Sequence, residues 1–252
     1  MKKYIRNILR PIYYLAEALY SKMLEMIYPT KIKDYKNIPI IINNRNRLTF
    51  LSSLIENLEK RGYTNIYIID NDSSYPPLLE YYKKINHKIF FLKENIGHLA
   101  LWQTGLYKKF IRDYYVYTDP DIIPIDECPD DFLDFFRNCL DKHKFAKKVG
   151  FSLKIDDLPD HYKNKENVIS WESQFFKNKT SDGLYRAHID TTFALYRPWA
   201  KGGSNGSHIT YRTAYPYEAR HMPWYVNSKE LPEEELYYIE HAKQSTFWTK
   251  KS

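Results

Sequence analysis

Short apolar runs alternate with longer amphipathic segments along the first half of the chain, up to about residue 125. The apolar runs, predicted to be strands, are residues 38–42, which are expected to be buried, 67–69, 88–92 and 114–118. The amphipathic segments, predicted to be helices, are residues 48–61, 76–85 and a segment that opens at 94–98 and continues to about 110. Strands and helices that alternate at this spacing favour an α/β fold with a parallel sheet and right-handed crossovers.

The pattern is less regular after residue 125. A helix is predicted over 130–144, a strand over 149–153, a polar loop over 156–167, strands over 168–176 and 189–196, a glycine-rich loop over 198–208, and a last helix from about 232 to 247. We therefore divide the chain into an amphipathic segment (1–34), a main α/β domain (35–228) whose first half ends near residue 125, and a C-terminal helical tail (229–252).

The first 30 residues place apolar side chains close to a helical period, with basic residues between them and Pro11 as the expected site of a kink. Charges interrupt every long apolar run, so we expect neither a transmembrane span nor a signal peptide. Two interpretations are open: the helix lies on an anionic membrane leaflet, or it packs on the core of its own domain. We favour the first.

Composition narrows the classes of partner. With 43% hydrophobic and 17% aromatic residues among 252, the chain is long and apolar enough to fold around a core. A net charge of +7 favours anionic partners, and because no nucleic-acid-binding motif is present we expect a phosphorylated small molecule or a membrane surface, with no nucleic acid. Cys128 and Cys139 lack CxxC spacing, which fits structural thiols in a reducing cytosol.

Asp119-Pro120-Asp121 follows the fourth predicted strand. The proline keeps this segment extended, so both carboxylates are expected at the carboxyl edge of the sheet, where α/β proteins bind ligands. Two oxygen donors at that edge suit a divalent cation that also holds phosphate oxygens. The alternative is an ordinary turn, since Asp and Pro are common turn residues.

Three further strand ends carry polar residues at corresponding places: 43–45 (Asn-Asn-Arg), 70–74 (Asp-Asn-Asp-Ser-Ser) and 95–97 (Asn-Ile-Gly). With the Asp-Pro-Asp segment, this order resembles the GT-A fold glycosyltransferases, particularly the family 2 type, over about residues 38–125. The resemblance implies a nucleotide-diphospho-sugar transferase fold with a mostly parallel sheet, and Mn²⁺ or Mg²⁺ bound by Asp119 and Asp121. The Gln-Arg-Arg-x-Trp motif of processive synthases is missing, and the C-terminal half matches only loosely.

The same resemblance implies that a nucleotide-sugar donor is bound by Arg45, Asp70, Asn71, Asn95, Gly97 and Asp119. Each of these residues also has a structural interpretation: Arg45 as a solvated charge at the following helix, Asp70 as a helix cap, and the Asn95 to Gly97 segment as a turn.

An inverting transfer needs a base near the acceptor hydroxyl, and Asp190, before a predicted strand, is our candidate, with Glu172 as its rival and a structural carboxylate as the alternative. Trp171, Trp199 and Trp224 are candidates for stacking on sugars, although tryptophan more often packs in the core. His221 is our candidate for a third metal ligand, because Arg220, Pro223 and Trp224 flank it in an extended segment that can fold back over the site. Its alternative is a hydrogen-bonded loop histidine, and His208 is next in order.

Together these observations predict a metal-dependent glycosyltransferase that moves a sugar, from UDP by preference, to a glycan or glycolipid acceptor with inversion. We expect it in bacterial surface polysaccharide or lipopolysaccharide synthesis, in the cytoplasm and peripheral to the inner face of the membrane. The alternatives are a sugar-phosphate nucleotidyltransferase, which needs a glycine-rich loop that residues 43–48 lack, and a non-catalytic carbohydrate-binding protein.

Overall fold

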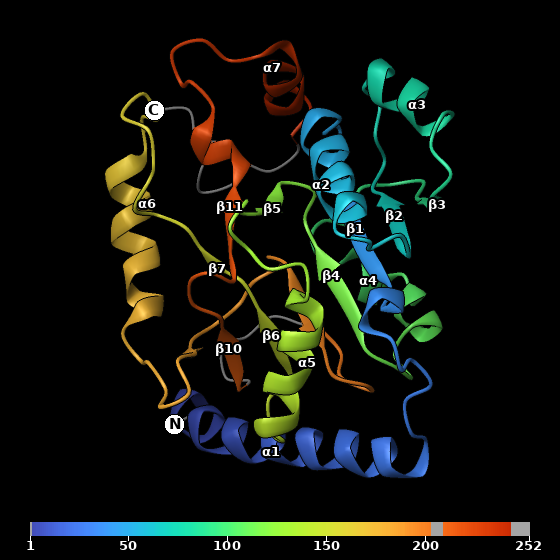
Figure 1. Ribbon diagram of the computed structural model, residues 1–252, viewed down its shortest axis with the longest axis vertical. Helices are drawn as coiled ribbons and strands as arrows, with labels where there is room; N and C mark the ends of the chain where they lie inside the picture. The colour runs from blue at the N-terminus through green and yellow to red at the C-terminus, as the bar shows by residue number, and fades with distance from the viewer. Residues whose placement is uncertain (1, 203–208, 243–252) are drawn as a thin grey trace.

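The computed structural model describes residues 2–202 and 209–242. Its main feature is a central sheet with helices on both faces (Figure 1). In spatial order the strands are β3 (Lys88–Phe91), β2 (Ile66–Asp70), β1 (Ile40–Asn44), β4 (Tyr115–Thr118), β9 (Ala194–Tyr196), β6 (Lys148–Gly150), β10 (Thr210–Arg212) and β8 (Tyr185–Arg186).

The four strands of the first half, β3-β2-β1-β4, are all parallel, as the sequence predicts. The second half adds β9 antiparallel to both β4 and β6, β10 parallel to β6, and β8 antiparallel to β10. The predicted α/β fold, with a large and mostly parallel sheet flanked by helices, is confirmed.

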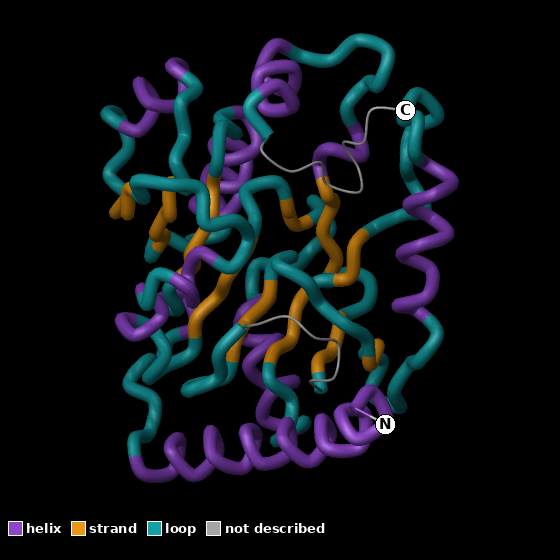
Figure 2. The backbone as a smooth tube through the Cα atoms, turned by 180° about the vertical axis from the view of Figure 1, so that it is seen from behind, coloured by secondary structure: helices purple, strands orange, loops and turns teal. Residues whose placement is uncertain are grey.

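Side-chain alternation along β1 defines the layers on the two faces of the sheet. Ile40 and Ile42 enter the larger core with α2 (Thr49–Lys60) and α5 (Phe132–Lys142), whereas Ile41 enters a second core on the opposite face with α4 (Ala100–Gln103). All three isoleucines are fully buried, as expected for a parallel strand covered on both sides. The sheet therefore holds its strand ends on a rigid frame (Figures 1 and 2).

A second, three-stranded sheet lies beyond the end of β4. It consists of β5 (Ile122–Pro124), β11 (Glu218–His221) and β7 (Ser152–Leu153), with β11 antiparallel to β5 and parallel to β7. None of β5, β10 and β11 was predicted, because strands of three or four residues leave almost no periodic signal. This sheet brings the C-terminal part of the chain back to the Asp-Pro-Asp segment.

Several predicted elements were wrong. Residues 168–176 are not a strand but the end of α6 (Lys165–Glu172) and a 3₁₀ turn, Ser173–Phe176, because Val168 and Glu172 are buried four residues apart on one helical face. Of 189–196, only β9 is a strand. The predicted helix up to residue 110 is broken into α4 and a 3₁₀ turn, Leu106–Lys109, by Gly105, whose φ of 77° is left-handed.

The terminal helices lie at opposite ends of the molecule (Figure 1). The first, α1 (Lys2–Ile27), is one helix that continues across Pro11 and, seen from behind, runs along one end of the fold (Figure 2). The last, α7 (Glu233–Glu240), follows a 3₁₀ turn, Met222–Tyr225, and is shorter than the predicted tail helix. Residues 243–252 of that tail, and residues 203–208 of the predicted glycine-rich loop including His208, lie outside the described residues. The remaining elements are α3 (Pro76–Tyr82) and a 3₁₀ turn, Tyr35–Asn37.

Candidate functional site

The loops after β1 and β2 are joined to each other by hydrogen bonds. The side-chain oxygen of Asn46 accepts hydrogen bonds from the backbone N–H groups of Ser74 (2.7 Å) and Tyr75 (3.0 Å), and the backbone N–H of Asn46 donates to Ser73 Oγ at 3.0 Å. Asn46 and Asp72 both have positive φ values, 53° and 65°, a conformation that Asn and Asp tolerate better than most residues. The carboxyl edge is therefore built from two mutually fixed loops.

Three of the predicted donor-binding residues, Asn71, Asn95 and Gly97, meet at this edge. Asn71 accepts a hydrogen bond from the backbone N–H of Ile96 (2.8 Å) and donates one to the carbonyl of Gly97 (3.0 Å), and the Gly97 N–H donates to Asn95 Oδ1 at 2.9 Å. Gly97 has a φ of 82°, which explains the glycine. The structure thus assembles three of the four predicted strand ends, and here Asn71 and Asn95 shape the loop with their side chains.

Asp70 is buried beside this loop, at the end of β2. One of its carboxylate oxygens accepts a hydrogen bond from the Ser73 N–H at 3.0 Å, as in the capping interpretation. The other oxygen, Oδ2, makes no hydrogen bond at ordinary distance among the described residues, although the carboxylate lies beside the hydroxyl of Tyr82. A buried acceptor left in this way is costly unless a ligand donates to it, so Asp70 retains one site for a hydroxyl or N–H group.

Asp119 is held inside the edge. Its carboxylate accepts a hydrogen bond from Thr191 Oγ1 at 2.5 Å, and its backbone N–H donates to the Thr191 carbonyl at 3.1 Å. Burial, and then the nearby charge of Asp121, raise the pKa of Asp119 well above its usual range. Two carboxylates in this position repel each other, and a bound cation would remove that repulsion.

Asp121 and His221 come together although 100 positions separate them in the chain. Strand β11 pairs with β5 so that His221 lies opposite Ile122, the residue after Asp121, and His221 Nε2 lies 3.7 Å from Asp121 Oδ2. Burial lowers the pKa of His221, which favours the neutral imidazole that a metal ligand requires. Trp224 packs against the ring, with centroids 4.7 Å apart. The sequence-predicted histidine is thus next to the predicted acid.

This donor set fits a divalent cation shared with phosphate oxygens. Two ligands on adjacent positions of one octahedral ion lie about 3 Å apart, close to the distance between Asp121 and His221. Asp121 Oδ1 is also buried without a hydrogen-bond partner among the described residues. In the same described part of the chain, however, no three His, Cys, Asp or Glu side chains are grouped as a metal site. Asp121 and His221 are therefore the direct candidates, whereas one carboxylate oxygen of Asp119 is already bonded to Thr191.

Arg47 lies within electrostatic reach of both residues of this pair, and sequence reasoning missed it in favour of Arg45. Arg47 is buried, forms an ion pair with Glu235, and stacks on the ring of Tyr238 at 3.7 Å from its centroid. The charge of Arg47 contributes to the lowered pKa of His221, which places it within electrostatic reach of the site. Only the fold distinguishes the two arginines, since both follow β1.

Arg45 instead fixes the end of the C-terminal helix, by donating to the carbonyl of His241 at 2.9 Å. Helix α7 is held over the strand ends by further contacts. Glu234 accepts hydrogen bonds from the backbone N–H (2.9 Å) and the hydroxyl (3.0 Å) of Thr49, at the start of α2. Tyr237 Oη lies 3.1 Å from Ser74 Oγ. The predicted tail is thus part of the wall around the site (Figure 1).

Two buried cations, Lys148 and Arg212, position the loop that carries Asp190. Lys148 Nζ donates to the carbonyl of Asp190 at 2.7 Å and to Tyr196 Oη at 3.0 Å, and Arg212 Nε donates to the carbonyl of His188 at 2.8 Å. Burial lowers the pKa of Lys148 to about 7. The side chain of Asp190 is exposed, as a group that meets an incoming acceptor must be. Sequence reasoning missed Lys148 because a lysine at the start of a strand usually reaches solvent.

The rival base, Glu172, lies in a different environment. It is buried and forms an ion pair with Arg212 at 2.6 Å, so its carboxylate is already used to hold the arginine. Among the tryptophan candidates, Trp224 is buried in the core beside His221, Trp199 packs on Tyr28, and Trp171 on α6 is exposed. Trp171 is the most exposed of the three, at 52%, and it packs edge-on against Phe175.

Comparisons with known proteins give only distant likenesses. No protein-family model and no curated protein sequence matches the chain. Among solved structures, the chain is similar to a mannosyltransferase from Pyrobaculum calidifontis in complex with GDP-Man and Mn²⁺, at 11% identity and a TM-score of 0.44, over 92% of this chain and 70% of that one.

Two further similar structures are nucleotidyltransferases or related synthases. One is a cytidylyltransferase from Leptospira borgpetersenii serovar Hardjo-bovis, at 11% identity and a TM-score of 0.37, over 64% of this chain and 60% of that one. The other is a 4-diphosphocytidyl-2C-methyl-D-erythritol synthase from Anaerococcus prevotii, at 10% identity and a TM-score of 0.42, over 81% of this chain and 95% of that one. Similarity at this level does not extend to substrate or reaction.

Proposed function

We propose that this protein is a divalent-metal-dependent glycosyltransferase of the GT-A, family 2-like type. It would transfer a sugar from a nucleotide-diphosphate donor, UDP by preference, to a glycan or glycolipid acceptor in bacterial surface polysaccharide or lipopolysaccharide synthesis. The observation that carries the proposal is the meeting of Asp121 and His221 at the carboxyl edge of the sheet, with the buried cation of Arg47 within electrostatic reach. Such an edge suits an anionic diphosphate better than a neutral ligand.

Each group at the edge has a separate task in this proposal. Oδ2 of Asp70 accepts a hydrogen bond from the nucleoside, and the loop held by Asn71 and Gly97 forms the wall of its pocket. Asp121 and His221 would hold Mn²⁺ or Mg²⁺, which when bound neutralises the charge of the departing diphosphate. Arg47 adds a fixed positive charge that needs no reorganisation during the reaction.

The acceptor is activated from the other half of the domain. Asp190 accepts the proton of the acceptor hydroxyl as that oxygen attacks the anomeric carbon, while the bond from that carbon to the diphosphate breaks. Lys148 and Arg212 hold the backbone of this loop, so the carboxylate keeps its direction during attack. One displacement of this kind inverts the anomeric configuration.

Binding and turnover test the proposal in two steps. A thermal-shift screen of nucleotide sugars with and without Mn²⁺ should find a donor that stabilises the protein only when the metal is present, because a ligand of the native state raises its apparent stability. Release of nucleoside diphosphate should then require the metal and rise with a sugar acceptor. If neither donor binding nor release of nucleoside diphosphate depends on the metal, the proposal is refuted.

The same assays distinguish the other candidate functions. A sugar-phosphate nucleotidyltransferase would instead consume a nucleoside triphosphate and release pyrophosphate from a sugar 1-phosphate. The loop of residues 43–48, which contains no glycine, argues against triphosphate binding. A carbohydrate-binding protein without activity would bind sugar and show no donor hydrolysis, with or without Mn²⁺.

A further inference from the structure

Helix α1 presents its polar side to the protein. Glu17 forms an ion pair with Lys147 at 3.0 Å, and Glu25 forms ion pairs with Lys22 at 2.9 Å and with the buried Arg197 at 3.4 Å. Ser21, between the two acids, is buried. A surface helix normally does the reverse and packs its apolar side on the core.

The opposite side of α1 is apolar and exposed. Ile12 is 61% exposed, Leu19 is 52% exposed and Met26 is 71% exposed, and they recur at the spacing of one helical face. Tyr20, Met23 and Ile27 are also exposed on this helix, whereas Leu15 lines a cavity on the protein side and Tyr28, just after the helix, packs on Trp199. A continuous apolar face of this length on a folded protein indicates an interaction surface.

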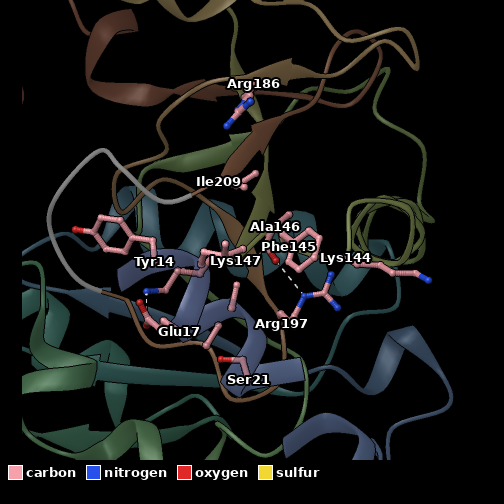
Figure 3. A pocket seen from close by; sticks show the side chains of 13 residues that line it. Tyr14, Glu17, Ser21, Lys144, Phe145, Ala146, Lys147, Arg186, Arg197 and Ile209 are labelled. Carbon is pink, nitrogen blue, oxygen red and sulfur yellow. Dashed lines mark hydrogen bonds and ion pairs between the residues drawn. The ribbon is translucent and has the colours of Figure 1, made fainter. Parts of the chain in front are cut away.

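The charges of α1 indicate what covers this face. The helix contains five basic residues and only two acids, Glu17 and Glu25, and both acids are engaged on the protein side. Behind the helix lies a cavity of about 150 Å³ whose lining includes Lys144, Lys147 and Arg186 (Figure 3). The described outward side of α1 is therefore apolar, and by its sequence the helix as a whole has a net charge of +3.

We propose that α1 is a docking surface for an anionic lipid bilayer, on which it lies flat. Apolar side chains and tyrosines would enter the interface, and the net positive charge of the helix would attract it to lipid phosphates. No helix within residues 2–202 and 209–242 has the length and hydropathy to cross a bilayer. A second copy of the chain fits less well, because pairing through α1 would bring two basic helices together.

This proposal does not depend on the proposed function. Helix α1 lies at the opposite end of the molecule from α7, which packs on the donor edge (Figure 1). A bilayer bound along α1 would leave that edge open to the aqueous phase. Changes on the apolar face should therefore alter docking and leave turnover with soluble substrates unchanged.

Vesicle sedimentation of the full chain is the first test. We expect binding to vesicles of phosphatidylcholine with phosphatidylglycerol, weaker binding to phosphatidylcholine alone, and loss of binding with rising salt. The triple variant Ile12→Ser, Leu19→Ser, Met23→Ser should bind at least about tenfold more weakly. Phe91→Ser, which removes an apolar side chain that is 62% exposed on β3, should bind like the wild type.

A depth measurement distinguishes docking from simple charge attraction. Cys128 and Cys139 are both buried, so a Met23→Cys variant can be labelled selectively with an environment-sensitive dye. Its emission should shift to the blue on anionic vesicles, whereas the same dye on Ser53→Cys, at an exposed position of α2, should not shift. Full-length protein that stays in the supernatant, or a dimer in light scattering that the triple variant dissociates, would overturn the proposal.

Discussion

His221 Nε2 lies 3.7 Å from Asp121 Oδ2, and the pairing of β11 with β5 holds the two residues in that relation. The backbone strengthens the link, because the N–H of Met222 donates to the carbonyl of Asp121 at 2.9 Å. The pair is thus set by a sheet and not by a mobile loop. Sites built on strands are held in place more firmly than sites on loops.

If this pair binds the cation, His221→Ala should weaken the apparent affinity for Mn²⁺ and lower turnover by about tenfold or more. Excess Mn²⁺ should restore part of the rate, because the remaining oxygen ligands still bind the ion. Turnover as a function of Mn²⁺ concentration measures both effects. His87→Ala is the matched control, since His87 also pairs with an acid, Glu59 at 3.1 Å, outside the site. An unchanged apparent metal affinity in His221→Ala would exclude the ligand role.

Asp119→Asn should separate stability from activity. The pKa of Asp119 is raised by burial and by Asp121, so the ionised carboxylate destabilises the metal-free fold at neutral pH. The amide removes that charge and can still accept from Thr191, so the melting temperature in EDTA should stay the same or rise while metal-dependent turnover is lost. Asp126→Asn, at an exposed position, should change neither. A marked fall in melting temperature would mean that the carboxylate is structural.

The first half of the fold could be predicted from the sequence because β1, β2 and β4 are largely buried and its helices are amphipathic. Runs such as 38–42 have no other plausible place than a covered parallel sheet. The second half could not be predicted in this way. Its strands β5, β10 and β11 are three or four residues long, and α6 contains the β-branched Val168 and Ile169, which favour a strand on composition alone.

Site residues at the ends of strands could be predicted from the sequence. Site residues that are positioned by long-range packing could not. Asp70, Asn71, Asp119 and Asp121 follow strands whose ends share an edge, so their meeting follows from the parallel sheet. Arg47 and Lys148 could not be assigned to the site from the sequence. Arg47 is covered by helix α7, and Lys148 is buried by the order of the strands, and both are long-range features. Such contacts leave no local pattern.

Asp190→Asn should affect turnover, whereas Glu172→Gln should affect the stability of the fold. Asp190 is exposed, so its substitution should lower turnover by roughly two to four orders of magnitude without loss of stability or donor binding. Glu172 is buried against Arg212, so its substitution leaves an unpaired buried cation and should cost about 3 kcal/mol of stability. Turnover and urea unfolding of both variants check this. Near-normal turnover in Asp190→Asn would rule it out as the base.

Arg47 and Arg45 should differ in their effect on the donor. Arg47→Gln should raise the KM for the nucleotide sugar by about tenfold or more, because its charge lies within reach of the Asp121 and His221 pair. Arg45→Gln removes a bond to the His241 carbonyl and should chiefly loosen the end of α7. Steady-state kinetics, with proteolysis of the C-terminal segment as a readout of α7, compares them. A larger KM effect in Arg45→Gln would return the phosphate role to Arg45.

Lys148 should make the free energy of unfolding depend on pH in the alkaline range. Its pKa is lowered by burial to about 7 in the folded protein, against about 10.4 in an unfolded chain. Between these values the unfolded state binds the proton and the folded state does not, so the contribution of Lys148 to stability rises with pH across this window. Below pH 7 the cost of burying the charged lysine is present in full.

Lys148→Met should therefore gain in stability relative to the wild type at pH 7.5 and lose that advantage at pH 9.5, by roughly 2 kcal/mol over the two pH units. The methionine also loses the hydrogen bonds to the Asp190 carbonyl and Tyr196, but that loss is the same at both pH values and does not alter the slope. Urea unfolding at each pH measures the difference, with the exposed Lys60→Met as the control. A difference between Lys148→Met and the wild type that does not change with pH would show that Lys148 keeps its ordinary pKa in the folded protein.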